Sequence, residues 1–141
     1  MTTEKQTTTK FRWWAFLVVA VFIAGMVIVG VKNLPRGFDM DLDKIGTGKS
    51  AIVFVYDNNL SVSGLQTAEM DKIRDRFDDR VHFLVANTGR PQAYQWMAHH
   101  QARAADLFFF DAQGELRHRQ SALLAADELV DDIGAVLQIA E

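Results

Sequence analysis

The hydrophobic positions divide the chain into two parts with different patterns. Residues 13–31, WWAFLVVAVFIAGMVIVGV, form an unbroken run of nineteen residues without a charged side chain. After residue 50, hydrophobic residues instead occur in short clusters separated by polar turns, which is typical of a globular domain. The two parts are therefore interpreted separately.

The apolar run has the length of a transmembrane helix. At about 1.5 Å per residue it extends roughly 28 Å, close to the hydrocarbon thickness of a bilayer. Basic residues flank it on both sides, and Trp13 and Trp14 stand where an interfacial aromatic belt would place them. A cleavable signal peptide would have a shorter apolar core that ends in small residues, whereas Val27-Ile28-Val29 stands here. We therefore predict an uncleaved signal-anchor: a tail at 1–12, a transmembrane helix at 13–31, a linker at 32–50 and a domain at 51–141.

Charge asymmetry predicts the orientation of this anchor. The leading segment carries Lys5, Lys10 and Arg12 against Glu4, whereas the net charge of the whole chain is −3, so the domain is strongly acidic. The positive-inside rule then favours a cytoplasmic N-terminus and an exported domain. We expect a single-pass protein of the bacterial inner membrane with a periplasmic C-terminal domain. An acidic domain repels phosphate backbones, so nucleic acid is excluded as a partner.

The domain is predicted to contain strands at 51–56, 81–86 and 107–110, which are short apolar runs typical of buried strands. Turn residues at 111–114 lead into a polar, edge-like strand at 115–120. Strands joined by helices are expected to pair in parallel, and the closing hairpin is antiparallel.

Three helices are predicted between and after these strands. The first begins at Ser63, which forms a capping box with Gln66, and its core face is Met70, Ile73 and Phe77. The second runs from Pro91 to about residue 101 with Tyr94 and Met97 facing inward. The last helix has an apolar stripe made of Leu129, Ile133, Val136, Leu137 and Ala140.

The resulting β-α-β-α-β-β-α order resembles the thioredoxin family from about Ser50 to the C-terminus. The segments that carry the resemblance are the strand AIVFVYD, the strand-turn-strand segment LFFFDAQGEL and the closing helix ADELVDDIGAVL. This resemblance implies an α/β fold of three layers with a mixed sheet. With the predicted anchor, the arrangement is similar to that of TlpA/ResA-type periplasmic thioredoxins.

The chemistry of that family is missing from this sequence. The family carries Cys-x-x-Cys at the start of the first domain helix, where the helix N-terminus lowers a thiol's pKa. The resemblance places Leu60 at the attacking cysteine and Ser63 at the resolving one. The chain has no cysteine, which excludes disulfides, thiolate metal sites and thiol–disulfide oxidoreductase activity. The family's cis-proline corresponds to about Ala105, where a trans peptide bond is expected.

The resemblance implies a groove that holds extended polypeptide, and without cysteines such a groove would bind a partner without a covalent step. We predict a redox-inactive interaction, assembly or accessory subunit of a membrane complex in the cell envelope, not an enzyme, with a membrane or periplasmic protein as partner and no cofactor. The candidate groove residues are Asn59, Leu60, Ser61, Val62, Ser63, Gly64, Ala104 and Ala105.

Alternative functions remain open at this point. A metal or ligand carrier, or an enzyme of other chemistry, would use His99, His100 or acidic residues, although adjacent histidines on a helix point about 100° apart and do not chelate as an i, i+4 pair would. No metal site is assigned. The GKS at Gly48 lacks the preceding glycine of a phosphate-binding loop and leads into a strand, so nucleotide binding is excluded. A purely structural role, in which the anchor itself packs in the membrane, is a further alternative.

Overall fold

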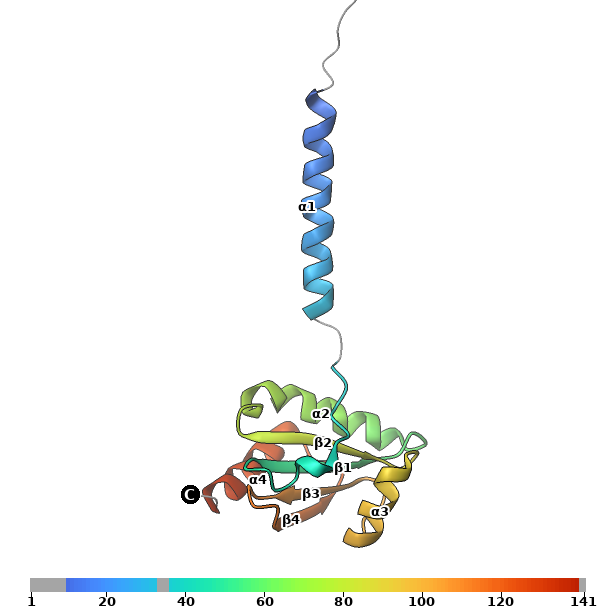
Figure 1. Cartoon of the computed structure of the whole chain (residues 1–141), viewed down its shortest axis with the longest axis vertical. Coiled ribbons are helices and arrows are strands. Elements are labelled where there is room, and N and C mark those ends of the chain that lie inside the picture. Colours follow the sequence, from blue (N-terminus) through green and yellow to red (C-terminus); the bar gives the residue numbers. More distant parts are fainter. Residues whose placement is uncertain (1–9, 33–35, 140–141) are drawn as a thin grey trace, which may run out of the picture. The chain divides into compact units, whose positions relative to one another are not determined.

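The computed structural model of the chain describes residues 10–32 and 36–139, which belong to two units divided after Gly37. The first unit contains the helix α1 (Lys10–Lys32), shown in Figure 1. Its large apolar side chains between Trp13 and Ile28 are exposed. Over the described residues, no helix has both the length and the apolar character needed to cross a membrane, so the predicted transmembrane helix is not confirmed. Residues 1–9 of the predicted tail and 33–35 of the predicted linker lie outside the described residues.

The second unit contains the predicted β-α-β-α-β-β-α order. Its elements are β1 (Ser50–Tyr56), α2 (Ser61–Phe77), β2 (Val81–Asn87), α3 (Pro91–His100), β3 (Asp106–Phe110), β4 (Leu116–Ser121) and α4 (Ala126–Ile139). They build one mixed sheet of four strands in the order β2-β1-β3-β4, which confirms the predicted α/β class.

Strand direction agrees with the prediction in two of the strand pairs and differs in the third. β1 and β2 are parallel, and the β3–β4 hairpin is antiparallel, as expected. β3, however, runs antiparallel to β1, so the expected parallel pairing is wrong there. Gln101 and Ala105, which both have positive φ, bracket the turn after α3. This turn brings the chain to the carboxyl end of β1, where the Ala105 N–H donates to the Val55 carbonyl at 2.9 Å.

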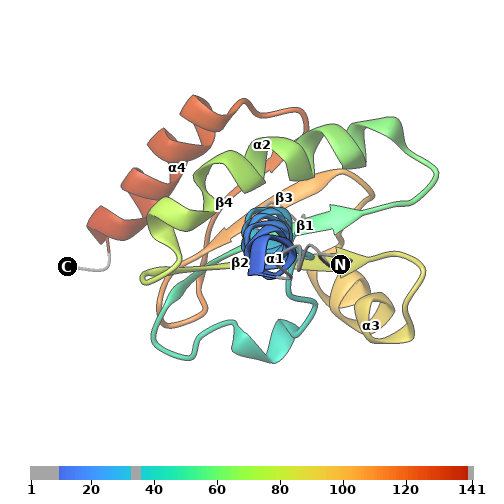
Figure 2. The same ribbon diagram turned by 90° about the horizontal axis from the view of Figure 1, so that it is seen from above.

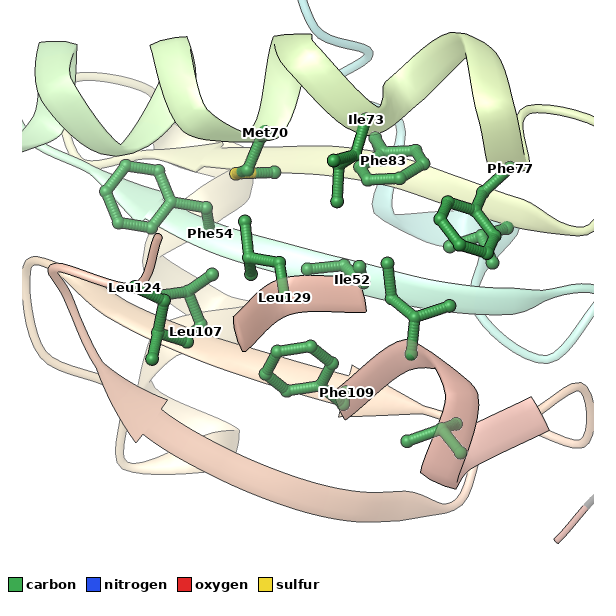
Figure 3. Close-up of a cluster of buried hydrophobic side chains, with 13 residues drawn as sticks. Ile52, Phe54, Met70, Ile73, Phe77, Phe83, Leu107, Phe109, Leu124 and Leu129 are labelled. Carbon is green, nitrogen blue, oxygen red and sulfur yellow. The ribbon is translucent and has the colours of Figure 1, made fainter. Parts of the chain in front are cut away.

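The sheet separates two hydrophobic layers. Figure 2 shows α2 and α4 on one face of the sheet and α3 on the other. Because side chains alternate along a strand, β1 sends Ile52 and Phe54 to the first face and Val53 and Val55 to the second. The predicted core face of α2 is confirmed, since its three residues pack against the strands (Figure 3). In α4 the predicted Leu129, Ile133 and Val136 are buried, while Ala140 lies outside the described residues.

The sheet-facing side of α3 differs in part from the prediction. Ala93 is buried, and Trp96 and Met97 pack against the second hydrophobic layer. Tyr94 is 59% exposed, so its predicted inward position is wrong. The residues that contact the sheet follow the i, i+3, i+4 spacing from Ala93, which leaves Tyr94 on the outer side of the helix.

The segment before β1 is packed against the domain from Phe38 onward. The Val85 N–H donates to the Asp39 carbonyl at 2.8 Å, and a short 3₁₀ helix, η1 (Leu42–Lys44), follows. Gly46 then approaches the β3–β4 turn so closely that a Cβ atom added there would lie 3.0 Å from the Gln113 carbonyl oxygen. The stretch assigned to the linker thus contains a packed lead-in to β1.

Candidate functional site

The loop between β1 and α2 and the first turn of α2 contain the predicted groove residues 59–64. α2 begins at Ser61, with Leu60 at the N-cap position and no side-chain cap. Ser63 is buried within the first turn, and its hydroxyl accepts a hydrogen bond from the Asp57 N–H at 3.1 Å. The Asp57 carboxylate in turn accepts from the Asn59 N–H at 2.8 Å. These two hydrogen bonds stabilise the loop around Asp57. The helix begins at Ser61, two residues before the predicted start at Ser63.

The predicted capping box is therefore wrong, and Gln66 has another role. Gln66 is fully buried and hydrogen-bonded to the backbone of Leu124 in both directions. Its Nε2 donates to the Leu124 carbonyl at 3.1 Å, and its Oε1 accepts from the Leu124 N–H at 2.7 Å. Gln66 thus fixes α2 to the segment that leads into α4.

The start of α2 presents unpaired donors beside an apolar side chain. The Ser63 N–H donates to the Leu60 carbonyl at 3.0 Å, but within the described residues the N–H groups of Ser61 and Val62 have no acceptor. The first amides of a helix have no intrahelical partner and carry its partial positive charge. The Leu60 side chain next to them is 41% exposed. This edge therefore offers hydrogen-bond donors and an apolar contact together.

The second predicted segment, Ala104-Ala105, lies at the carboxyl end of β1. Ala105 has φ 68° and is held on both sides, because its N–H donates to Val55 and its carbonyl accepts from the Ala122 N–H at 2.8 Å. The peptide bond before Ala105 is trans, as expected. Ala104 differs from its neighbour: in the described part of the chain, neither its N–H nor its carbonyl has a hydrogen-bond partner.

The structure brings the two predicted segments to the same edge of the sheet. Ala105 is bonded to Val55, and the loop with Asn59 and Leu60 follows Tyr56, the last residue of β1. Tyr56, Ala105 and Ala122 each pack against the hydrophobic layer under α2. Gly64 lies one turn into α2 and is exposed, with open space where a side chain would extend.

Sequence reasoning missed two buried carboxylates at the ends of β3. Asp106 is 5% exposed, and its Oδ2 accepts from the Arg103 N–H at 2.8 Å and from Arg119 Nη2 at 2.6 Å. Its Oδ1 accepts from the Ser121 hydroxyl at 3.0 Å. Burial alone raises the pKa of Asp106, but these three donors outweigh burial and hold the pKa below its ordinary value of 3.8.

Asp111 forms the corresponding cluster after the other end of β3. It is 1% exposed and accepts from the backbone N–H groups of Gln113 and Glu115 at 3.0 and 2.9 Å. Arg117 Nε donates to its Oδ2 at 2.6 Å. Burial again raises the pKa, and the hydrogen bonds lower it further than burial raises it. The sequence does carry a signal for these two clusters. Asp106 and Asp111 stand on either side of the apolar run LFFF, and the next predicted strand contains Arg117 and Arg119, two residues apart.

The histidines do not gather with other potential metal ligands. His100 stacks on Trp96 with ring centroids 4.3 Å apart, and its Nδ1 lies 2.9 Å from the Trp96 carbonyl oxygen. His99 is exposed beside it. Among the described residues, no three histidine, aspartate or glutamate side chains are grouped so that they could hold a metal ion.

Two of the cavities in the described part of the domain are lined by charged side chains. The larger, about 590 Å³, is bounded by the lead-in to β1, the end of β2 and the start of α3, and its lining includes Asp41, Arg90 and Trp96. The smaller, about 440 Å³, is polar and is lined by Gln101, Arg103, Asp106, Arg119, Gln120 and Ser121. The second cavity directly adjoins Ala104 along the chain.

Comparisons with known proteins identify the fold. The sequence matches no known family and no curated protein. Among solved structures, it is similar to thioredoxin-2, a component of malaria parasite protein secretion machinery, with a TM-score of 0.59 and 11% identity over 72% of this chain and 96% of that one. A second malarial protein gives a TM-score of 0.56 and 12% identity over 63% and 98%. The domain therefore has a thioredoxin-like fold.

Proposed function

We propose that this chain is a redox-inactive, thioredoxin-like subunit that binds an extended polypeptide without forming a covalent bond. In the cell envelope it would act as an interaction, assembly or accessory subunit of a membrane complex. The observation that carries the proposal is the backbone of Ala104, whose N–H and carbonyl have no partner among the described residues, at the sheet edge where Leu60 is exposed.

An extended chain lying along Ala104 would satisfy both of these backbone groups. Main-chain hydrogen bonds of this kind give affinity without requiring a particular sequence, and adjacent side-chain contacts give specificity. Leu60 would provide the apolar contact, and the N–H groups of Ser61 and Val62, which have no acceptor among the described residues, would donate to a carbonyl oxygen of the partner. Because the chain contains no cysteine, such binding is reversible and independent of redox state.

The strained turn beside Ala104 supports a binding role. Gln101 and Ala105 are non-glycine residues with positive φ, a conformation that costs roughly 1–2 kcal/mol for a residue with a side chain. Such outliers persist only where surrounding bonds fix them, and they gather at ligand-binding segments. Here the bonds of Ala105 to Val55 and Ala122 fix the conformation that leaves the Ala104 backbone unpaired.

The proposed location at the membrane rests on the sequence. The uncharged run 13–31, the basic residues around it and the exposed apolar side chains of α1 support an anchor with a cytoplasmic N-terminus and a periplasmic domain, an arrangement like that of the TlpA/ResA-type proteins. Confinement to a membrane would raise the effective concentration of the domain near membrane proteins.

The proposal is tested by purifying the tagged full chain from its native membranes in mild detergent and identifying bound chains by mass spectrometry. We expect a stoichiometric membrane or periplasmic partner that is lost with Leu60→Asp. Tyr94→Asp is the control, because Tyr94 is similarly exposed but lies on α3. Equal recovery of the partner with both variants would contradict the proposal, as would recovery of the chain alone.

A second function is favoured by the cavity of about 590 Å³. Its lining combines the carboxylates of Asp41 and Asp43 with the guanidinium of Arg90 and the indole of Trp96, whose Nε1 is buried without a partner in the described structure. A small ligand carrier would use such a cavity. Denaturing mass spectrometry of the chain purified from native membranes, with detection of a released small molecule, separates this function from polypeptide binding.

A further inference from the structure

The smaller polar cavity next to Ala104 contains an excess of positive charge. Its charged lining residues are Arg103, Asp106 and Arg119, so the lining contains two basic residues and one acidic residue. The remaining lining residues are neutral. This local excess stands out because the domain as a whole is strongly acidic.

The carboxylate inside the cavity is already fully engaged. Asp106 accepts three hydrogen bonds, from the Arg103 N–H, from Arg119 Nη2 and from the Ser121 hydroxyl. The Asp106 N–H also donates to the Arg103 carbonyl at 3.2 Å, so the carboxylate and the turn that bears Arg103 hold each other in place. Asp106 is thus a positioning residue for both arginines.

Both guanidinium groups retain free donors. The Arg103 side chain has no hydrogen bond or ion pair within the described part of the chain, and it is exposed. Arg119 uses only Nη2, which donates to Asp106 and to the Gln101 carbonyl at 3.0 Å. Its guanidinium carbon lies 4.7 Å from the centroid of the Phe108 ring, a cation–π contact that fixes its orientation. The cavity therefore offers one guanidinium group held in a fixed orientation, that of Arg119, and one that is exposed and has no partner among the described residues, that of Arg103.

We propose that this cavity binds the carboxylate of an acidic side chain carried by the polypeptide that lies along Ala104. This inference rests on the proposed function, because the polypeptide has to be held at Ala104 for its side chain to reach Arg103. Guanidinium groups match a carboxylate in geometry and charge and form the stronger class of hydrogen bond with it. A free small anion is repelled by the acidic domain, whereas a tethered carboxylate gains from its high effective concentration.

The test compares two synthetic peptides, acetyl-Ala-Leu-Glu-Ala-amide and acetyl-Ala-Leu-Gln-Ala-amide, which differ in one charge. Their affinities for the full chain in a non-ionic detergent are measured by titration calorimetry, with acetate as a third probe. We expect the glutamate peptide to bind about tenfold tighter than the glutamine peptide, and acetate to bind more weakly than either. Arg103→Gln should remove the preference, since it deletes the free guanidinium and keeps the backbone bonds to Asp106.

Arg90→Gln is the matched control, because Arg90 is an exposed arginine that lines the other cavity. It should leave the tenfold preference unchanged. Equal binding of the two peptides would overturn the acidic-side-chain assignment and leave polypeptide binding intact. Failure of both peptides to bind would overturn the proposed function together with this inference. Acetate binding as tight as the glutamate peptide, or a preference retained in Arg103→Gln, would also overturn it.

Discussion

Arg119 on β4 donates from Nη2 to Oδ2 of Asp106 at 2.6 Å, across the start of β3. Two residues earlier on β4, Arg117 makes the matching contact with Asp111 beyond the other end of β3. The register of the hairpin shifts between these two contacts, because Phe109 pairs with His118 and Phe110 with Leu116, which leaves Arg117 at the irregularity. An edge strand whose residues are all exposed is thereby joined to the buried β3 at both ends.

Asp106→Asn should lower the free energy of unfolding by about 2 kcal/mol. The change keeps the shape of the side chain but removes the charge that Arg119 and Ser121 contact, and hydrogen bonds to a charged group contribute more than neutral ones. The Arg119 side chain is 36% exposed, so solvent reduces the penalty below that of a fully buried pair. Urea denaturation of the full chain measures the change. Asp79→Asn is the control, because Asp79 is exposed and its contact with Arg80 is long. It should lower the free energy of unfolding by less than about 0.5 kcal/mol. A similar loss of stability in both variants would contradict the stabilising role of the Asp106 contacts.

Stability should fall in acid because of the two buried carboxylates. The pKa values of Asp106 and Asp111 lie below the ordinary 3.8 in the folded domain, so the unfolded chain takes up protons first as the pH decreases. Their contribution is complete above pH 3.8 and is lost as the pH falls through the lowered folded values. The measurement is urea denaturation at several pH values between about 6 and about 2.5. Asp106→Asn should make the acid decrease shallower, and an unchanged slope would contradict this origin.

Gln66→Met should destabilise the domain by about 3 kcal/mol. Methionine fits the space, but it leaves the N–H and carbonyl of Leu124 buried without partners, and each such loss costs about 1–3 kcal/mol. Gln95→Met, at an exposed position on α3, serves as the control and should change stability by less than about 0.5 kcal/mol. Thermal or urea unfolding compares the two. Equal stability of both variants would show that the Gln66 contacts do not hold α2 to the segment before α4.

Replacing Gly46 and Gly64 by alanine should change the stability of the domain in opposite directions. Gly46 has φ 79°, and a Cβ atom there would lie 3.0 Å from the Gln113 carbonyl oxygen and 3.2 Å from Gly114 Cα, so Gly46→Ala should cost about 1–3 kcal/mol. Gly64 lies in α2 with open space around it, so Gly64→Ala should stabilise by up to about 1 kcal/mol. Unfolding of both variants is the measurement. A neutral Gly46→Ala would mean that the lead-in does not pack against the β3–β4 turn.

Strand and helix positions were predictable because local patterns determine them. The apolar runs that became β1, β2 and β3 are buried almost throughout, and Pro91 stands at the start of α3 as its fixed φ favours. The start of α2 was mispredicted because Ser63 and Gln66 satisfy a local capping rule. Ser63 instead accepts from the Asp57 N–H in the preceding loop, and Gln66 bonds to the distant backbone of Leu124, and the capping rule covers neither choice.

The candidate site was predictable in place but not in detail. The resemblance located Leu60 and Ala105 beside the end of β1, and the structure adds that Ala105 is held while Ala104 is unpaired among the described residues. The roles of Asp106 and Arg119 depend on the register of β3 with β4, which pairs Phe108 with Arg119. That register is a property of the assembled sheet, so sequence spacing alone did not reveal the polar cavity.

The central claim is that a partner polypeptide lies against Leu60 and Ala104. The most direct measurement places a photo-reactive benzoylphenylalanine at Leu60 in the full chain and, in a second variant, at Tyr94, followed by irradiation in native membranes. We expect a discrete crosslinked adduct from position 60 and none from position 94, since both positions are exposed but only the first borders the proposed groove. The same adduct from both positions, or none from position 60, would contradict it.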